Sequence, residues 1–166
     1  LVNTNGTVLA AGASGHAFAL ARYLTDGSLD TSFATVGRVL TTDLSSVGNP
    51  GHANGYAAAL HSGGTTLVAG FDGFDSSTFA VIRYKSDGTL DTSFNTVGIF
   101  RTSIGTAGAK AYSLVVDSSG RITVGGQAGG FSSAMIRLLS SGSLDTSFNT
   151  TGKFTGSATA IQGLAL

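Results

Sequence analysis

Gly27-Ser28-Leu29-Asp30-Thr31-Ser32-Phe33 is the first of three copies of one seven-residue stretch, called the signature below. The second copy, at 88–94, begins 61 residues later, and the third, at 142–148, begins 54 residues after that. The segments that flank each copy recur in the same order. Such self-similarity at a nearly constant period predicts three similar supersecondary units, arranged as a stack or a ring.

Each unit is expected to contain four short β-strands. Short apolar runs alternate with clusters of Gly, Ser, Asn and Asp, which is typical of strands joined by tight turns. All nine acidic residues are Asp, and Gly contributes 25 residues, so the composition disfavours helices. The first strand of each unit is recognised only by the residues at its end. The expected strands are 1–2, 7–12, 18–23 and 38–42 in the first unit, 60, 65–70, 79–84 and 99–103 in the second, and 115–116, 121–126, 133–138 and 153–155 in the third.

We therefore predict an all-β fold of three four-stranded repeats that form propeller-like blades. The repeats of this single domain, 1–166, are expected at about 1–55, 56–111 and 112–160, with 161–166 as a closing strand. Propellers usually have about four to eight blades, so three units leave ring closure open. Either other copies or further repeats of a longer chain complete the ring, or the three units close as a three-fold β-prism or trefoil-like domain.

An arginine stands eight residues before the signature aspartate in every repeat. It lies near the end of an otherwise apolar strand, where an unpaired buried charge is costly. We expect each aspartate to accept hydrogen bonds from the arginine of its own or the adjacent repeat, and to cap the turn that follows. The pairs are Arg22 with Asp30, Arg83 with Asp91, and Arg137 with Asp145.

The same aspartates allow a second interpretation, a calcium-binding loop. Such a loop requires several oxygen ligands at alternating positions and a closing acidic residue, and the third repeat has Ser141 in place of the first aspartate. The structural interpretation is therefore preferred, and no metal or cofactor is assigned. The calcium alternative would use Asp26 with Asp30, Asp87 with Asp91, and Asp145 alone.

Ligand recognition is expected in the segments that differ between repeats, because a shared framework leaves recognition to its variable loops. These segments are 43–55, 71–78 and 129–132. The second carries two aromatic residues beside two carboxylates, a combination suited to stacking on sugar rings and accepting from hydroxyls, and equally to protein partners. The alternative is that the two phenylalanines only pack the loop. The candidate binding residues are Phe71, Asp72, Phe74, Asp75 and His52.

Composition argues against several classes of function. Nine basic residues balance nine acidic ones, so no net field favours nucleic acid or anionic lipid. No apolar run is long enough to span a bilayer, and the chain has no cysteine.

The sequence also has no recognisable catalytic motif. The three histidines lie in no metal-binding spacing, and no nucleophile elbow or phosphate loop is present. We expect no enzymatic activity; a glycoside hydrolase using Asp72 and Asp75 is a less favoured alternative.

The signature, the strands FALARY at 18–23 and FAVIRY at 79–84, and TLVAG at 66–70 together resemble the delta-60 repeat family of bacterial proteins. The resemblance covers all three units. It implies β-propeller-like blades in large secreted or surface-attached proteins, and it provides no catalytic residues. The third unit departs from the pattern, because Ser133 replaces an aromatic residue and Leu138 a tyrosine, so that blade is expected to pack differently.

These observations lead us to expect a non-enzymatic recognition or adhesion module in an extracellular or cell-surface setting. It would bind a surface glycan or protein, as a homo-oligomer or as part of a longer chain that completes the ring. A purely structural array that spaces other domains apart is the alternative. Neither nucleic-acid binding nor membrane insertion is expected.

Overall fold

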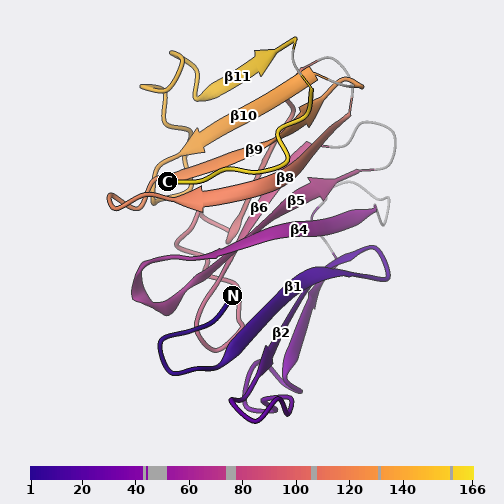
Figure 1. Ribbon diagram of the computed structural model, residues 1–166, viewed down its shortest axis with the longest axis vertical. Helices are drawn as coiled ribbons and strands as arrows, with labels where there is room; N and C mark the ends of the chain where they lie inside the picture. Colours follow the sequence, from indigo (N-terminus) through magenta and orange to yellow (C-terminus); the bar gives the residue numbers. More distant parts are fainter. Residues whose placement is uncertain (43, 45–51, 74–77, 106–107, 131, 158) are drawn as a thin grey trace.

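A computed structural model describes residues 1–42, 44, 52–73, 78–105, 108–130, 132–157 and 159–166. It shows three antiparallel sheets, which Figure 1 displays one above another from the N-terminal to the C-terminal sheet. No helix among these residues is long and apolar enough to cross a bilayer. Sheet 1 holds β1 (Val8–Ser14), β2 (Ala17–Tyr23) and β3 (Arg38–Thr41); sheet 2 holds β4 (Ala53–Leu60), β5 (Thr66–Asp72), β6 (Thr78–Tyr84) and β7 (Ile99–Thr102); sheet 3 holds β8 (Ala109–Val116), β9 (Ile122–Ala128), β10 (Ser132–Leu138) and β11 (Lys153–Gly156).

The sheets follow the predicted order of strands, with two differences at the repeat boundaries. Sheet 1 has three full strands, and its first strand is reduced to a bridge between Val2 and Val8. The boundaries expected at 55/56 and 111/112 fall inside β4 and β8. These strands begin in runs of small residues, which carry little strand signal of their own.

Residues 159–166, which include the expected closing strand, form no strand in the structure. Ile161 N donates to Gly126 O (3.0 Å), and Leu164 N donates to Ser113 Oγ (2.8 Å). The segment therefore lies against β8 and β9 of sheet 3. The three sheets remain separate, and no named strand of sheet 1 pairs with a strand of sheet 3. The blade arrangement is thus observed without a closed three-fold barrel.

The sheets meet most closely along one edge. β4 packs against β1 and β2 of the preceding sheet and against β8 of the following one, and β8 packs against β5 and β6. We therefore call β4 and β8 the inner strands. In each inner strand the register shifts around a single residue, between Gly55 and Ala57 and between Ala111 and Ser113. These are β-bulges, which re-aim the side chain of the extra residue.

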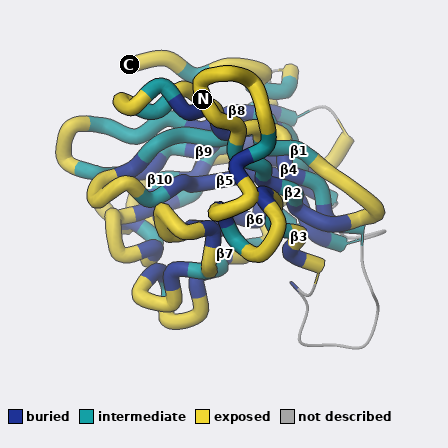
Figure 2. Tube along the Cα trace, turned by 90° about the horizontal axis from the view of Figure 1, so that it is seen from below, coloured by how far each residue is buried: buried dark blue, intermediate teal, exposed yellow. Residues whose placement is uncertain are grey.

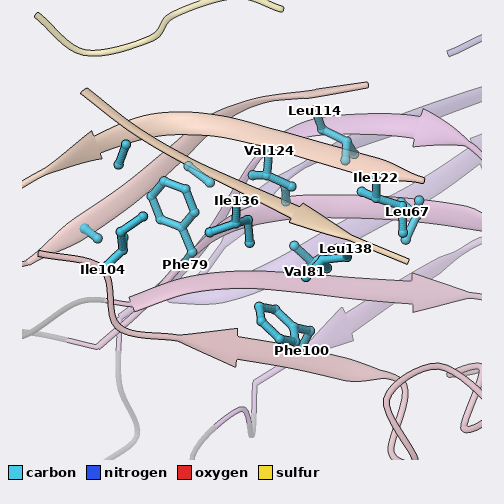
Figure 3. Packing of buried hydrophobic residues seen from close by; sticks show 14 of the residues in the cluster. Leu67, Phe79, Val81, Phe100, Ile104, Leu114, Ile122, Val124, Ile136 and Leu138 are labelled. Atoms are coloured by element: carbon cyan, nitrogen blue, oxygen red, sulfur yellow. The ribbon is translucent and has the colours of Figure 1, made fainter. Parts of the chain in front are cut away.

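Apolar cores fill the two spaces between sheets. One core joins sheets 1 and 2, and the other joins sheets 2 and 3. Figure 3 shows the second, where Phe79, Val81 and Phe100 of sheet 2 belong to one buried cluster with Val124 and Ile136 of sheet 3. Figure 2 shows that buried residues lie in the strands and exposed ones mainly in the turns. The sheets are therefore held together by their faces, as blades are.

The third repeat packs differently at one of the two positions where its sequence departs from the pattern. Tyr84 is fully buried in repeat 2, and its hydroxyl lies 2.7 Å from Thr41 Oγ1 of repeat 1. Burial raises the pKa of Tyr84 to about 12. Leu138 is buried at the corresponding place in repeat 3 and has no hydroxyl group. Thr102, the equivalent of Thr41 in repeat 2, donates instead to Ser103 O (3.3 Å).

Replacing Tyr84 by Phe is expected to destabilise the fold by about 1 kcal/mol, because the cross-sheet hydrogen bond to Thr41 is lost. Urea unfolding of Tyr84→Phe, Thr41→Val and the double variant would measure the coupling between the two groups. The control is Tyr23→Phe, since Tyr23 is the partly exposed equivalent in repeat 1. Strictly additive effects of the two substitutions would contradict the prediction.

Candidate functional site

The signature forms the same compact polar unit in every repeat. Each arginine Nε lies 2.7–2.8 Å from Oδ2 of the aspartate eight residues later, in its own repeat. The other carboxylate oxygen accepts from the backbone N and the Oγ of the signature serine that follows, at 2.6–3.1 Å. The guanidinium carbon lies 4.7–4.9 Å from the ring centroid of the signature phenylalanine. The aspartate thus closes the turn and fixes the arginine at once.

The arginine also reaches the following repeat. Arg83 Nη1 donates to Ser140 O at 2.6 Å. One residue after the signature, Asn95 N donates to Ser141 O at 2.8 Å. We call these contacts, with the ring packing described next, the inter-repeat joint. The joint between repeats 1 and 2 has the same form: Arg22 Nη1 to Ser86 O (2.7 Å) and Ala34 N to Asp87 O (2.7 Å).

The glycine that opens each following signature completes the joint. A Cβ atom on Gly142 would lie 2.8 Å from Cδ2 of Phe94, and one on Gly88 would lie 3.0 Å from Cζ of Phe33. Both glycines also have φ near +90°, which L side chains rarely adopt. In repeats 2 and 3 the first residue of the signature is therefore glycine because its backbone rests on the phenylalanine ring of the preceding repeat.

The signature aspartates are held in the ionised form. The pKa of Asp30, Asp91 and Asp145 lies below the ordinary value of 3.8, chiefly because the signature serine hydroxyl donates to each carboxylate. The serine backbone N–H and the arginine lower the pKa further, while burial opposes them. The polar unit is therefore an ion pair with its acceptor oxygens already engaged.

The residues of the calcium interpretation are engaged by protein donors. Asp26 Oδ1 accepts from the N and Oγ of Ser28 at 2.9 and 2.6 Å. Asp87 Oδ1 accepts in the same way from Thr89 at 2.8 and 2.7 Å. A cation would have to displace these donors as well as the arginine. Within the ranges that the structure describes, no three His, Cys, Asp or Glu side chains gather as metal ligands.

A second feature is a group of aromatic side chains at the inner strands. The Tyr56 ring stacks on Phe71, with centroids 5.8 Å apart and planes 26° apart, and it lies 5.6 Å from the Tyr112 ring. Lys110 Nζ lies 5.0 Å from the Phe71 centroid. Tyr56 is 50% exposed, whereas Phe71 is buried. We call these four residues the aromatic cluster.

The two bulges explain why the tyrosines meet. Tyr56 and Tyr112 are the extra residues of the bulges in β4 and β8. Because the two inner strands pack against each other, the bulges bring both rings to one place. Burial raises the pKa of Tyr112, and the nearby Tyr56 adds to the shift. The cluster thus depends on the packing of neighbouring repeats.

The structure corrects the predicted loop at 71–78 at its beginning. Phe71 and Asp72 belong to β5, which stays paired with β4 and β6 to its end. Asp72 is 3% exposed, and its carboxylate pairs with Arg101 of β7. It is therefore a buried member of an ion pair and not a surface acceptor. Phe74 and Asp75 lie outside the described residues.

The histidines occupy separate places. The rings of His52 and His16 meet edge to face, with centroids 3.9 Å apart. His61 is buried, and its Nε2 lies 3.1 Å from Gly120 O of repeat 3. His52 thus has its ring contact with the hairpin of repeat 1, and His61 links two repeats.

Sequence reasoning named Phe71, in a predicted loop, but not the other three members of the aromatic cluster. One signal was available: a tyrosine occupies the same repeat position in two strands rich in small residues, GYA at 55–57 and AYS at 111–113. Lys110 has no comparable signal, because its position over Phe71 depends on the contact between β5 and β8.

Acid is expected to unfold the protein through the signature aspartates. Because their folded-state pKa is lowered, the unfolded chain binds protons that the folded chain does not once the pH falls below about 4, and stability declines from there. At higher pH this contribution is complete and constant. Thermal unfolding by circular dichroism between about pH 2 and pH 6 checks this.

The variant Asp91→Asn serves as the comparison, since it removes one of the signature aspartates and leaves the others, and Asp26, Asp87 and Asp117, whose pKa is also lowered, in place. It should be less stable than the original protein at about pH 6 and lose less stability on acidification. A Tm that stays constant down to about pH 2 in the original protein would contradict the assignment.

Comparisons with known proteins agree with this architecture. A search of curated proteins found no match. A family model described as "Domain of unknown function (DUF5122) beta-propeller" matches residues 4–33, 63–94 and 118–148, together more than half of the chain. Each matched segment ends at the phenylalanine of a signature. The chain therefore belongs to the DUF5122 β-propeller family.

Proposed function

We propose that this protein is a non-enzymatic recognition module that binds a glycan or protein ligand at the cell surface or outside the cell. The observation that carries the proposal is the half-exposed Tyr56, whose ring packs against Phe71 and Tyr112. An aromatic ring that is already ordered loses little conformational freedom on binding, which favours affinity.

The aromatic cluster offers chemistry that suits both kinds of ligand. Tyrosine combines an apolar ring face with a hydroxyl group, so it stacks on sugar rings or apolar side chains and also forms hydrogen bonds. Lys110 adds a cation over the Phe71 ring. Aromatic residues at the centre of an interface commonly supply most of its binding energy.

The framework itself does not require the tyrosines. In the segment that lies against sheet 3, Gln162 follows Ile161 and so stands at the repeat position that Tyr112, which follows Ala111, has in β8. This copy of the repeat therefore has no tyrosine there. Tyr56, Lys110 and Tyr112 also lie outside the segments that match the family model. A pair of rings that is neither repeated in every unit nor part of the matched segments is best explained by a function particular to this chain.

The extracellular setting is supported by the resemblance of the signature and its flanking strands to the delta-60 repeat family. The balanced charge of the chain supports a ligand other than nucleic acid. We also propose that another copy or further repeats complete the ring, because the named strands of sheets 1 and 3 do not pair with each other.

A purely structural array is the second candidate, and the repeated inter-repeat joint favours it. Glycoside hydrolysis is less well supported, because Asp72 is buried and paired with Arg101. A catalytic acid or base must instead reach the glycosidic oxygen or an attacking water.

Glycan arrays and binding to whole cells, with the purified chain as the probe, test the proposal. The double variant Tyr56→Ala/Tyr112→Ala is expected to bind at least about tenfold more weakly than the original protein, because stacking area is lost. The matched control is Val97→Ala, which truncates another exposed apolar residue, in a turn of repeat 2.

Two results would contradict the proposal. One is undiminished binding by the double variant with an unchanged circular dichroism spectrum. The other is no binding of the original protein to glycans or cells, which would favour the structural array.

A further inference from the structure

The third repeat presents one half of an inter-repeat joint. Arg137 Nε lies 2.7 Å from Asp145 Oδ2, and its guanidinium carbon lies 4.9 Å from the Phe148 centroid, as in the other repeats. In the other repeats Nη1 donates to the turn of the next repeat. Across the ranges that the structure describes, Nη1 of Arg137 has no such acceptor. This half of the joint therefore has an unused donor.

Apolar side chains on the same face are exposed where their equivalents are covered. Phe154 of β11 is 40% exposed, whereas Phe100 at the corresponding place in β7 is 7% exposed. Phe148 is only partly buried, whereas Phe33 and Phe94 are 2% and 0% exposed. The outer face of sheet 3 thus presents the same kinds of apolar side chain as the faces of sheets 1 and 2 that pack against a following sheet.

The first repeat presents the complementary half. Gly27 is exposed, with no atom near its Cβ position, whereas Gly88 and Gly142 rest on phenylalanine rings. Its backbone has nevertheless the same shape, with φ of +85° at Gly27, +89° at Gly88 and +91° at Gly142. The exposed turn of repeat 1 is therefore already in the conformation that the joint binds.

Two further features of repeat 1 support this comparison. Tyr23 is 36% exposed, while Tyr84 at the same repeat position is fully buried. Ala21 stands where repeat 2 has Ile82. The smaller residue leaves room for a large side chain such as Phe154 on an approaching face.

We propose that the third repeat of one molecule binds the first repeat of a second copy of this chain. Arg137 Nη1 donates to Thr25 O of the second copy, and Asn149 N donates to Asp26 O. Gly27 of that copy rests on Phe148. These are the contacts of the two internal joints, formed between molecules. The contact specifies how the ring of the proposed function is completed. It uses no member of the aromatic cluster, so it can fail while the proposed ligand binding at Tyr56 holds.

The same contact made twice closes a ring of two molecules. Each copy carries both halves of the joint, so the association is head to tail and continues until it closes. Two copies of three sheets give six blades, which lies within the usual range of about four to eight. The segment 159–166 of one copy then lies beside β1 of the other, whose edge beyond Leu9 has no strand partner among the described residues.

Light scattering after size-exclusion chromatography tests the proposal on the 166-residue chain. The expected mass at about 0.1 mM is twice 16.5 kDa. Phe154→Asp should yield the single-chain mass, because it places a charge in the contact. Leu139→Asp is the matched control, since Leu139 is 41% exposed and its equivalent Lys85 stays exposed in the internal joint.

A cross-linking experiment locates the contact. The chain has no natural cysteine. Asp26→Cys combined with Asn149→Cys should form a disulfide between molecules under mild oxidation, whereas Asp26→Cys alone should not. The corresponding internal pair, Asn95→Cys with Ser141→Cys, should form a disulfide within one molecule, which shows that the joint geometry permits the bond.

Three outcomes would overturn the proposal. They are a single-chain mass at every concentration up to about 0.1 mM, self-association that Phe154→Asp leaves unchanged, and assemblies larger than two copies. Circular dichroism and thermal unfolding of each variant establish that it is folded, so a loss of association is not confused with a loss of structure.

Discussion

One guanidinium group holds each repeat together and connects it to the next. In repeat 2, Arg83 directs Nε to Asp91, Nη2 to Ser93 and Nη1 to Ser140 O of repeat 3, at 2.6–3.0 Å. Only arginine has a planar fork of donors that can satisfy three directions at once, so lysine would not replace it. The charge is tolerated in a nearly buried position because its donors are satisfied. The same arginine side chain therefore orders its own repeat and binds the following one.

This arrangement separates the framework from the part of the molecule that is free to vary. The joints lie at the turns that follow β2, β6 and β10, whereas the sheets converge along the inner strands β4 and β8. The bulged residues of the inner strands are not needed by the joint. Tyr56 and Tyr112 can therefore serve recognition without weakening the connection between blades.

Much of the framework could be predicted from the sequence, because its signals are local and repeated. The eight-residue spacing of Arg83 and Asp91 reflects one strand and one turn, and the same spacing recurs in every unit. The ring contacts of Tyr56 could not be predicted, because they depend on how two bulged strands meet in space. The ion pair of Asp72 could not be predicted either, because its partner Arg101 has no equivalent in the other repeats, where Leu40 and Thr155 stand.

Amide hydrogen exchange by NMR tests most directly whether the arginine connects the repeats. Ala34 N and Asn95 N donate across the two internal joints, and Asn149 N stands at the same place in repeat 3. In the Phe154→Asp variant, the Ala34 and Asn95 amides should exchange at least about tenfold more slowly than that of Asn149. Arg83→Met should accelerate exchange at Asn95 while Ala34 keeps its protection. Equal exchange rates at the three amides, or an Asn95 rate indifferent to Arg83→Met, would contradict the account.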